Sequence, residues 1–145
     1  MSLSLKLQKA AIKGLGERGH GVETRVDETL PRVHADAALL ERAIANVVDN
    51  AVAWSPPGEA VRVEAGAIAG RVDLRVVDRG PGIPADQRER MFLPFQRLGD
   101  QSNGTGTGLG LAVARGFVEA MGGEITVEDT PSGGLTMVVS LEAMQ

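Results

Sequence analysis

The sequence predicts a single α/β domain, in which strands and helices mix without strict β–α–β alternation. Three observations support this prediction. The chain has 145 residues, the length of one ordinary domain. Hydrophobic residues make up 43% of it and charged residues 23%, as in a soluble globular protein with its own core. Its apolar residues alternate in some segments and recur at helical spacing in others, which indicates strands and helices respectively.

The first half of the chain predicts two helices and two strands. Apolar residues at helical spacing indicate an opening amphipathic helix over residues 3–15, ended by glycines. The alternating segment Val22–Val26 predicts a strand, and Pro31–His34 predicts a second, short one. Asp36 is then the expected N-cap of a long helix that reaches about Ala53 and ends before a Pro-Pro-Gly sequence.

The second half predicts two hairpins separated by helices and a loop. The first hairpin joins strands at 61–65 and 72–78 through Gly66–Gly70. The elements expected after it are a short polar helix at 85–91, a mobile polar glycine-rich loop at 96–106, a helix at 109–121, and a hairpin of strands 125–130 and 135–141.

Composition excludes several classes of site and partner. Cysteine is absent and the only histidines are His20 and His34, which excludes a structural zinc site and a cysteine nucleophile. No apolar stretch reaches the roughly 18 residues that a membrane span needs. The net charge of −4 argues against duplex nucleic acid as the main partner. We therefore expect a cytoplasmic protein with no nucleic-acid partner and no direct membrane contact.

The glycine-rich segment Gly104–Gly110 precedes a predicted helix, so its backbone N–H groups and the helix N-terminus can face an anion. A Walker loop requires a lysine after glycine, and no lysine follows Lys13. The glycine spacing also fails to match the dinucleotide-binding fingerprint. The segment is therefore either a helix cap or a phosphate loop of another kind.

Two polar motifs each have a structural and a functional interpretation. Asp78 ends a predicted strand and continues into Gly80-Pro81-Gly82, which is either a tight turn or the floor of a pocket. A carboxylate in a pocket accepts hydrogen bonds, for example from the exocyclic amino group of adenine. Asn46 and Asn50 lie four apart, on one helix face. They are either a satisfied edge of the core or oxygen ligands for Mg²⁺.

Taken together, these motifs resemble a known family. The segments that carry the resemblance, in chain order, are Asn46–Ala51, Asp78–Gly82, Phe92–Phe95 and Gly106–Gly110. Their order and spacing are similar to the asparagine, first glycine, phenylalanine and second glycine boxes of the catalytic ATP-binding domain of bacterial sensor histidine kinases. That domain belongs to the GHKL superfamily, with gyrase, the large heat-shock ATPase chaperones and MutL.

The resemblance covers about residues 20–142 and has implications for fold and boundaries. It implies a two-layer α/β sandwich of the Bergerat type: a mixed sheet of about five strands, three helices on one face, and a mobile ATP lid. Residues 1–19 are then a helical lead-in and residues 20–145 the catalytic domain. Within the family, Leu39–Asn50 and Thr130–Leu141 look like the potassium-responsive Kdp sensor kinases.

The resemblance also implies roles for individual residues. Asn50 resembles the principal Mg²⁺ ligand, Asn46 a residue that supports metal and phosphates, and Asp78 the acceptor for adenine N6. Arg97 matches a lid arginine that reaches the γ-phosphate and stabilises its transferring charge. The other implied nucleotide-binding residues are Trp54, Gly80, Gly82, Ile83, Gly106, Thr107, Gly108, Leu109, Gly110 and Thr136.

One part of the family pattern is missing. The family often has a Lys or Arg three residues after the metal-binding asparagine, followed by Tyr or His; here these positions are Ala53 and Trp54. Losing that cation removes a phosphate contact. Trp54 either stacks on the base or plugs the core at the end of the helix.

The residue at position 46 separates possible reactions. ATPases of the superfamily, and its serine kinases, place a glutamate four residues before the Mg²⁺ asparagine, where it acts as a general base. The amide of Asn46 has no useful basicity, whereas a histidine acceptor already carries a lone pair. The sequence therefore predicts a protein-histidine kinase with Asn46 and Arg97 in catalysis and Mg²⁺-ATP as cofactor. A degenerate nucleotide-binding regulatory module and a GHKL-type ATPase are the alternatives.

The phosphoacceptor is expected elsewhere. Neither His20 nor His34 has the sequence context of a phosphoacceptor, and the first 18 or so residues are too short for a helical hairpin. We therefore expect an excised catalytic domain. Its partner is the phosphoacceptor-histidine helical dimerisation domain of the same protein and, indirectly, a response regulator. The full protein is expected to be a membrane-bound sensor kinase of which this is the cytosolic portion.

Overall fold

A computed structural model describes the backbone of most of the chain. The described residues are 22–26, 30–31, 33, 35–56, 58–93, 110–131 and 133–143. The predicted opening helix at 3–15 and the predicted loop at 96–106 lie outside them.

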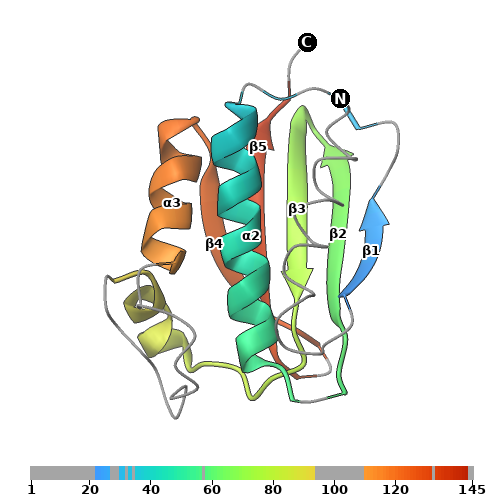
Figure 1. Ribbon diagram of the computed structural model, residues 1–145, viewed down its shortest axis with the longest axis vertical. Helices are drawn as coiled ribbons and strands as arrows, with labels where there is room; N and C mark the ends of the chain where they lie inside the picture. Colours follow the sequence, from blue (N-terminus) through green and yellow to red (C-terminus); the bar gives the residue numbers. More distant parts are fainter. Residues whose placement is uncertain are drawn as a thin grey trace.

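The described elements follow the predicted order. They are β1 (Val22–Val26), α2 (Ala37–Trp54), β2 (Val61–Ile68), β3 (Arg71–Val77), the 3₁₀ helix η1 (Ala85–Phe92), α3 (Gly110–Ala120), β4 (Glu124–Asp129) and β5 (Leu135–Glu142). The prediction of an α/β fold is confirmed (Figure 1).

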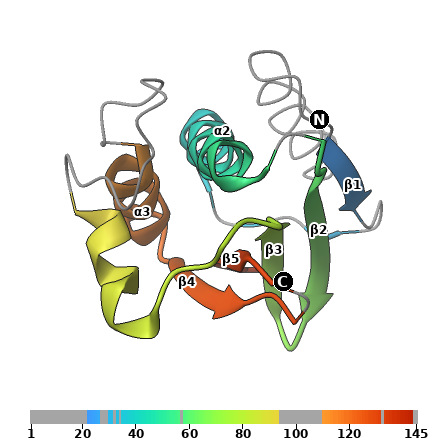
Figure 2. The same cartoon turned by 90° about the horizontal axis from the view of Figure 1, so that it is seen from below.

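The strands form one twisted sheet in the order β1-β2-β3-β5-β4. Strands β2, β3, β5 and β4 pair antiparallel, whereas β1 runs parallel to β2, with Val22 opposite Val61. Helices α2 and α3 form a second layer on one face, which is clearest when the sheet is seen end-on (Figure 2). The ends of β3 and α2 thereby lie near each other.

Of the predicted short strand Pro31–His34, Val33 makes an isolated bridge to Ala143, and Arg32 and His34 lie outside the described residues. One local prediction was wrong. The connection between β2 and β3 is tighter than predicted, because the strands pair as far as Ile68 opposite Arg71. The turn is then Ala69-Gly70, with φ of 53° and 80°, the left-handed conformation of a two-residue hairpin loop.

The core lies between α2, α3 and the sheet. The buried face of α2 consists of Leu40, Ala43, Ile44, Val47, Val48, Ala51 and Val52. Alternate residues of the strands meet it, among them Val63, Val76 and Val139, each at most 1% exposed. Burying each such side chain stabilises the fold by about 1.5–3 kcal/mol. This packing fixes α2 across the sheet and so fixes the polar residues along its flank.

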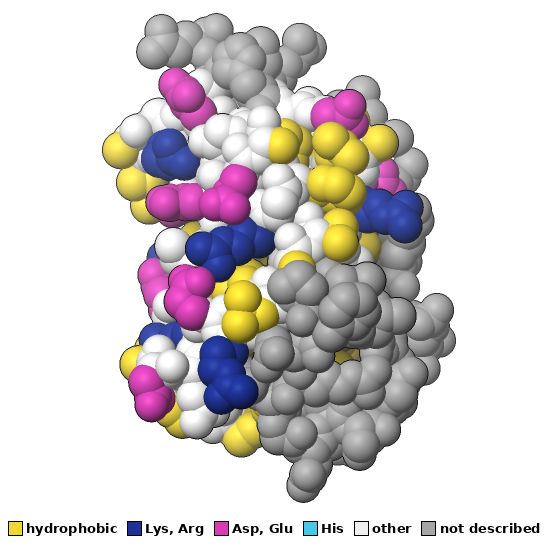
Figure 3. Space-filling view, turned by 90° about the vertical axis from the view of Figure 1, so that its left-hand side faces the viewer, with side chains coloured by type: hydrophobic (Ala, Val, Ile, Leu, Met, Phe, Trp, Pro, Cys, Tyr) yellow, Lys and Arg dark blue, Asp and Glu magenta, His cyan; other side chains and the backbone are white. Residues whose placement is uncertain are grey.

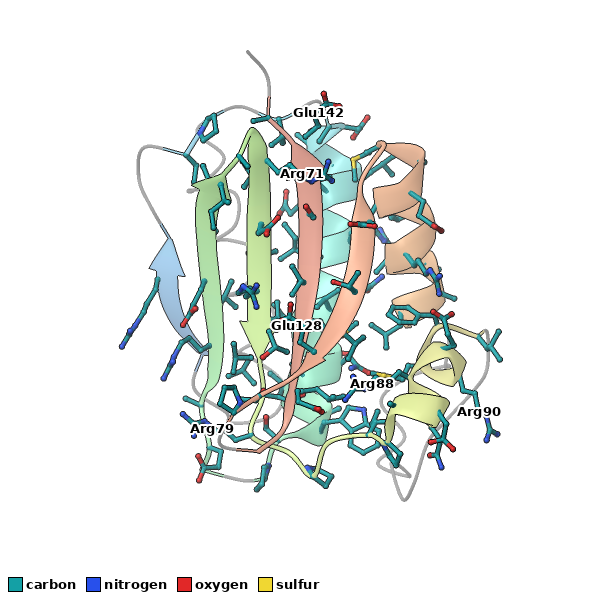
Figure 4. The ribbon with its side chains drawn as sticks, turned by 180° about the vertical axis from the view of Figure 1, so that it is seen from behind. Arg71, Arg79, Arg88, Arg90, Glu128 and Glu142 are labelled. Atoms are coloured by element: carbon teal, nitrogen blue, oxygen red, sulfur yellow. The ribbon has the colours of Figure 1, made fainter. Side chains whose placement is uncertain are left out.

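The opposite face of the sheet carries charged side chains, and no described helix covers it (Figure 4). Arg75 on β3 reaches Glu128 on β4 across β5, with 2.6 Å between Nη1 and Oε2. Arg71 donates from Nε to Oγ of Ser140 on β5 at 2.7 Å. These contacts brace the open face. Among the described helices, none has the length and apolarity to cross a bilayer.

The predicted N-cap of α2, Asp36, is confirmed, and its contribution to stability can be tested. Its Oδ1 accepts hydrogen bonds from the N–H groups of Ala38 at 3.0 Å and Leu39 at 3.1 Å. Asp36→Ala should lower the free energy of unfolding by about 1 kcal/mol, because two N–H groups lose their acceptor. Asp36→Asn keeps an acceptor oxygen and is the control. Urea denaturation would measure both; equal losses in the two variants would contradict the capping role.

Candidate functional site

Asp78 is a buried carboxylate at the end of β3, with 4% of its surface exposed. Its Oδ1 accepts hydrogen bonds from the N–H of Gly80 at 2.9 Å and the N–H of Leu135 at 3.0 Å. Its own N–H donates to the Leu135 carbonyl at 2.9 Å. Both recorded bonds to the carboxylate reach Oδ1; within the described ranges none reaches Oδ2. The second oxygen can therefore accept from a ligand.

Burial raises the pKa of Asp78 above the ordinary value of an aspartate, because the charged form loses water. The hydrogen bonds from Leu135 and Gly80 act in the opposite direction, and burial outweighs them. A buried carboxylate with a raised pKa is typical of a binding site.

The turn after Asp78 packs on the end of α2. A Cβ on Gly80 would lie 2.4 Å from the Trp54 carbonyl oxygen, so only glycine fits there. Gly82 has a φ of +77° and lies near the carbonyl of Gly134. Ile83 is 5% exposed and belongs to the core. The predicted turn is therefore present, and its glycines are also required by the protein's own backbone.

Trp54 packs against the core and is partly exposed. Its carbonyl is the group that Gly80 approaches. The neighbouring Ala53 is also partly exposed, so the position where the resembled family often has a cation lies at the surface of α2. Of the two interpretations of Trp54, the structure supports packing against the core.

The two asparagines lie on the flank of α2 that faces the start of α3. Gly110 is the first residue of α3, and a Cβ on it would lie 4.0 Å from both Cβ and Cγ of Asn46. Asn46 and Asn50 are each partly exposed. The N-terminus of α3 therefore lies beside Asn46. Unpaired N–H groups at a helix N-terminus favour anions.

Side-chain amide oxygens are suitable ligands for Mg²⁺, which prefers hard oxygen atoms and commonly shares them with substrate phosphates. Asn50 lies one helical turn after Asn46, toward the Asp78 end of α2. Within the described segments there is no group of three or more His, Cys, Asp or Glu side chains able to hold a metal. The donor set near α3 fits a metal that is bound jointly by an amide and by phosphate oxygens.

Thr136 is buried at 5% exposure, but its hydroxyl does not reach the Asp78 carboxylate. Its Oγ1 lies 3.0 Å from Oγ1 of Thr130, which in turn lies 3.5 Å from the Asp78 carbonyl. The β5 residue that donates to the carboxylate is Leu135, through its backbone N–H.

Sequence reasoning missed the turn before β5 as part of the site. A Cβ on Gly134 would lie 2.2 Å from the Asp78 carbonyl oxygen and 2.9 Å from Oδ1. The available signal was the Gly133-Gly134 pair directly before a strand. The remaining predicted residues, Arg97, Gly106, Thr107, Gly108 and Leu109, lie outside the described residues.

Elements beside the site are joined by Arg115 of α3. Its Nη1 lies 2.9 Å from Oε2 of Glu89 on η1, and its guanidinium lies 4.8 Å from the ring centroid of Phe92. Arg88 of η1 also pairs with Asp129 of β4. Figure 3 shows cationic and acidic side chains alternating on this side of the molecule. These contacts fix the two described elements that flank residues 94–109.

Known proteins share sequence similarity with this chain. Residues 35–145 match the family described as histidine kinase-, DNA gyrase B-, and HSP90-like ATPases. The sensor protein KdpD of Mycobacterium tuberculosis is 57% identical over 109 residues, which are 75% of this chain and 13% of KdpD. The kinase/phosphatase MprB of Mycolicibacterium vanbaalenii is 40% identical over 125 residues, 86% of this chain and 26% of MprB. The chain thus spans a small part of these relatives.

Solved structures show the same architecture. A mycobacterial sensor histidine kinase MprB superposes with a TM-score of 0.85 at 31% identity, covering 99% of this chain and 95% of that one. Full-length ShkA, in complex with AMPPNP, gives 0.80 at 29% identity and covers 99% of this chain and 31% of ShkA.

The raised pKa of Asp78 predicts how stability changes with pH. The folded state holds the Asp78 proton more tightly than the unfolded state. The free energy of unfolding therefore falls as pH rises from the ordinary aspartate pKa, about 3.9, through the raised pKa of the folded state. Asp78→Asn keeps an acceptor for the two N–H groups and removes the buried charge. We expect the variant to lack this fall and to be at least as stable at neutral pH. Denaturant titrations at several pH values test this; parallel curves for the two proteins would contradict it.

Proposed function

Because the chain belongs to the family of histidine kinase-, DNA gyrase B- and HSP90-like ATPases, and is the ATP-binding catalytic domain of a two-component sensor histidine kinase, we propose that it binds Mg²⁺-ATP and transfers the γ-phosphoryl group to a histidine outside this chain. In the transfer, the bond between the γ-phosphorus and the ADP oxygen breaks and a bond to an imidazole nitrogen forms.

The observation that carries the proposal is that α2 touches both ends of the site. Its last residue, Trp54, packs on the turn after Asp78, and Asn46 packs on the first residue of α3. Eight residues of helix separate these contacts, about 12 Å along the axis. This is the scale of a nucleoside triphosphate, with a carboxylate at one end and a helix N-terminus at the other.

In this arrangement Asp78 accepts from the 6-amino group of adenine, and the exposed part of Trp54 covers the base. Gly80, Gly82 and Ile83 form the wall beside them, and Thr136 supports Asp78 through Thr130. The residues that hold the phosphates are Gly106, Thr107, Gly108, Leu109 and Gly110, with Arg97 on the γ-phosphate. ShkA, whose solved structure contains AMPPNP, supports a nucleoside triphosphate as the ligand.

Mg²⁺ is the proposed metal, with Asn50 as its protein ligand and Asn46 beside it. Bound there, the ion would neutralise developing charge on the phosphates. Asn46 orients the phosphates and removes no proton, because an amide is not a base. The acceptor supplies its own lone pair if it is a neutral imidazole. This chemistry favours transfer to histidine over hydrolysis.

The full protein is proposed to be a membrane-bound sensor kinase, and the KdpD relative supports the potassium-sensor type. Residues 20–145 would be its catalytic domain, residues 1–19 a lead-in, and residues 96–105 the lid over the nucleotide. The partner is a helical dimerisation domain of the same protein that bears the acceptor histidine. A response regulator would receive the phosphoryl group next.

Phosphotransfer to the dimerisation domain tests the proposal. The chain, γ-labelled ATP and Mg²⁺ would be mixed with the separately produced dimerisation domain of the same protein. We expect acid-labile label on that domain and none when its histidine is replaced by glutamine. ATP binding without transfer would instead support a regulatory nucleotide-binding module, which Ala53 would explain. Steady release of phosphate by the chain alone would support a GHKL-type ATPase.

The role of Asn50 predicts a metal-dependent loss of affinity. Asn50→Ala should weaken Mg²⁺-ATP binding by about 10- to 100-fold, because a direct ligand is removed. ATP in excess EDTA should bind both proteins almost equally. Glu142→Ala, at an exposed position at the end of β5 away from Asp78, is the control and should leave both affinities unchanged. Calorimetric titration measures them; an equal loss with and without metal would remove Asn50 from the metal site.

A further inference from the structure

We infer that Gly134 and the N–H of Leu135 form a clamp that positions the Asp78 carboxylate and so sets the preference for a 6-aminopurine. Both belong to the turn and first residue of β5, apart from the motifs that suggested the site. The inference rests on the proposed function, because it concerns the base that Asp78 recognises.

Asp78 is held from both sides by main-chain groups. Leu135 donates to Oδ1 and accepts from the Asp78 N–H, so the two residues are joined twice. Gly134 lies directly against them: the Asp78 carbonyl and Oδ1 occupy the space that a side chain on Gly134 would need. The turn is itself closed by bonds from Gly133 N–H to the Thr130 carbonyl at 2.9 Å and from Thr130 N–H to the Gly134 carbonyl at 3.0 Å. The carboxylate therefore has no room to rotate toward β5.

The position of the carboxylate determines what it can recognise. Two N–H groups occupy Oδ1, so Oδ2 is the oxygen left for the base. A 6-amino group can donate to it, whereas the oxygen of a 6-oxopurine would face it as a second acceptor, and both would lose their hydrogen bonds to water. A carboxylate free to turn away would relieve this conflict and lose the discrimination.

The N–H of Leu135 donates to the Asp78 side chain and not to a neighbouring strand. The bond that closes the β4–β5 ladder at this end is donated by Thr130 to Gly134, while Leu135 donates to the side chain of Asp78. A hairpin turn alone would not require this donor to be aimed at a carboxylate.

Gly133 offers a matched control for Gly134. The two are neighbours with almost the same backbone conformation, φ of +105° and +103°. A Cβ on Gly133 would meet nothing within 4 Å, whereas one on Gly134 would collide with Asp78. An alanine at either position suffers the same left-handed strain, and only the one at Gly134 also displaces the carboxylate.

The test compares the affinity ratio of ATP to ITP, whose base carries oxygen in place of the 6-amino group. Titration of the two magnesium complexes would be done on the wild-type chain, Gly133→Ala and Gly134→Ala, with unfolding measured in parallel. We expect both variants to be less stable, the ratio to stay unchanged in Gly133→Ala, and the ratio to fall about tenfold or more in Gly134→Ala. An unchanged ratio in Gly134→Ala, or equal falls in both variants, would overturn the clamp.

A second measurement needs no variant and decides the matter if Gly134→Ala does not fold. The amide proton shifts of Leu135 and Gly80 would be followed by NMR in the wild-type chain as pH is varied. Both should follow one titration, that of the carboxylate they donate to, and ATP should suppress it. Amides that titrate independently of each other would overturn the clamp. Failure of the wild-type chain to bind ATP would instead refute the proposed function and leave the joint titration of the two amides intact.

Discussion

The structure depends on holding one carboxylate in the interior by backbone hydrogen bonds. Asp78 is kept there by two backbone N–H groups from separate segments, Gly80 in its own turn and Leu135 at the start of β5. These bonds stabilise the charge only in part, since burial still raises its pKa. An amide at this position would satisfy the same donors without burying a charge, so the acid fits the proposed function, in which its second oxygen accepts from a ligand.

Helix α2 fixes the distance between the Asp78 turn and the asparagines. Its apolar face is fixed on the sheet by residues with almost no exposed surface, such as Ile44 and Val48, so its polar flank cannot shift without disrupting the core. The flank carries Asn46 and Asn50, and its end meets Gly80. In the proposed function, base recognition and phosphate recognition therefore depend on one rigid helix, so that a shift at one end would also move the other.

Much of the fold could be predicted because its local signals agree. Asp36 as N-cap, the apolar stripe of α2 and the alternation in β3 each specify one structure. Signals failed where the outcome depends on tertiary pairing: Ile68 and its neighbours extend β2 because β3 is there to pair with them. The same limit applies to the site. Asp78 and the asparagines stand out by type and spacing, whereas Leu135 acts through its backbone, which leaves no mark on residue identity, and Gly134 is explained only by the approach of Asp78.

The donor set also constrains how the proposed reaction is accelerated. With an amide at position 46 in place of an acid, the described part of the site offers hydrogen-bond donors, a helix N-terminus and metal-binding oxygens, all of which act by position and charge. Such a site activates the phosphoryl group and leaves the nucleophile to its partner. A base on the catalytic domain would activate water whenever the partner is away, so an amide at position 46 favours transfer only when an acceptor histidine docks. In the proposed reaction, an amide at position 46 would therefore couple ATP use to the state of the partner domain.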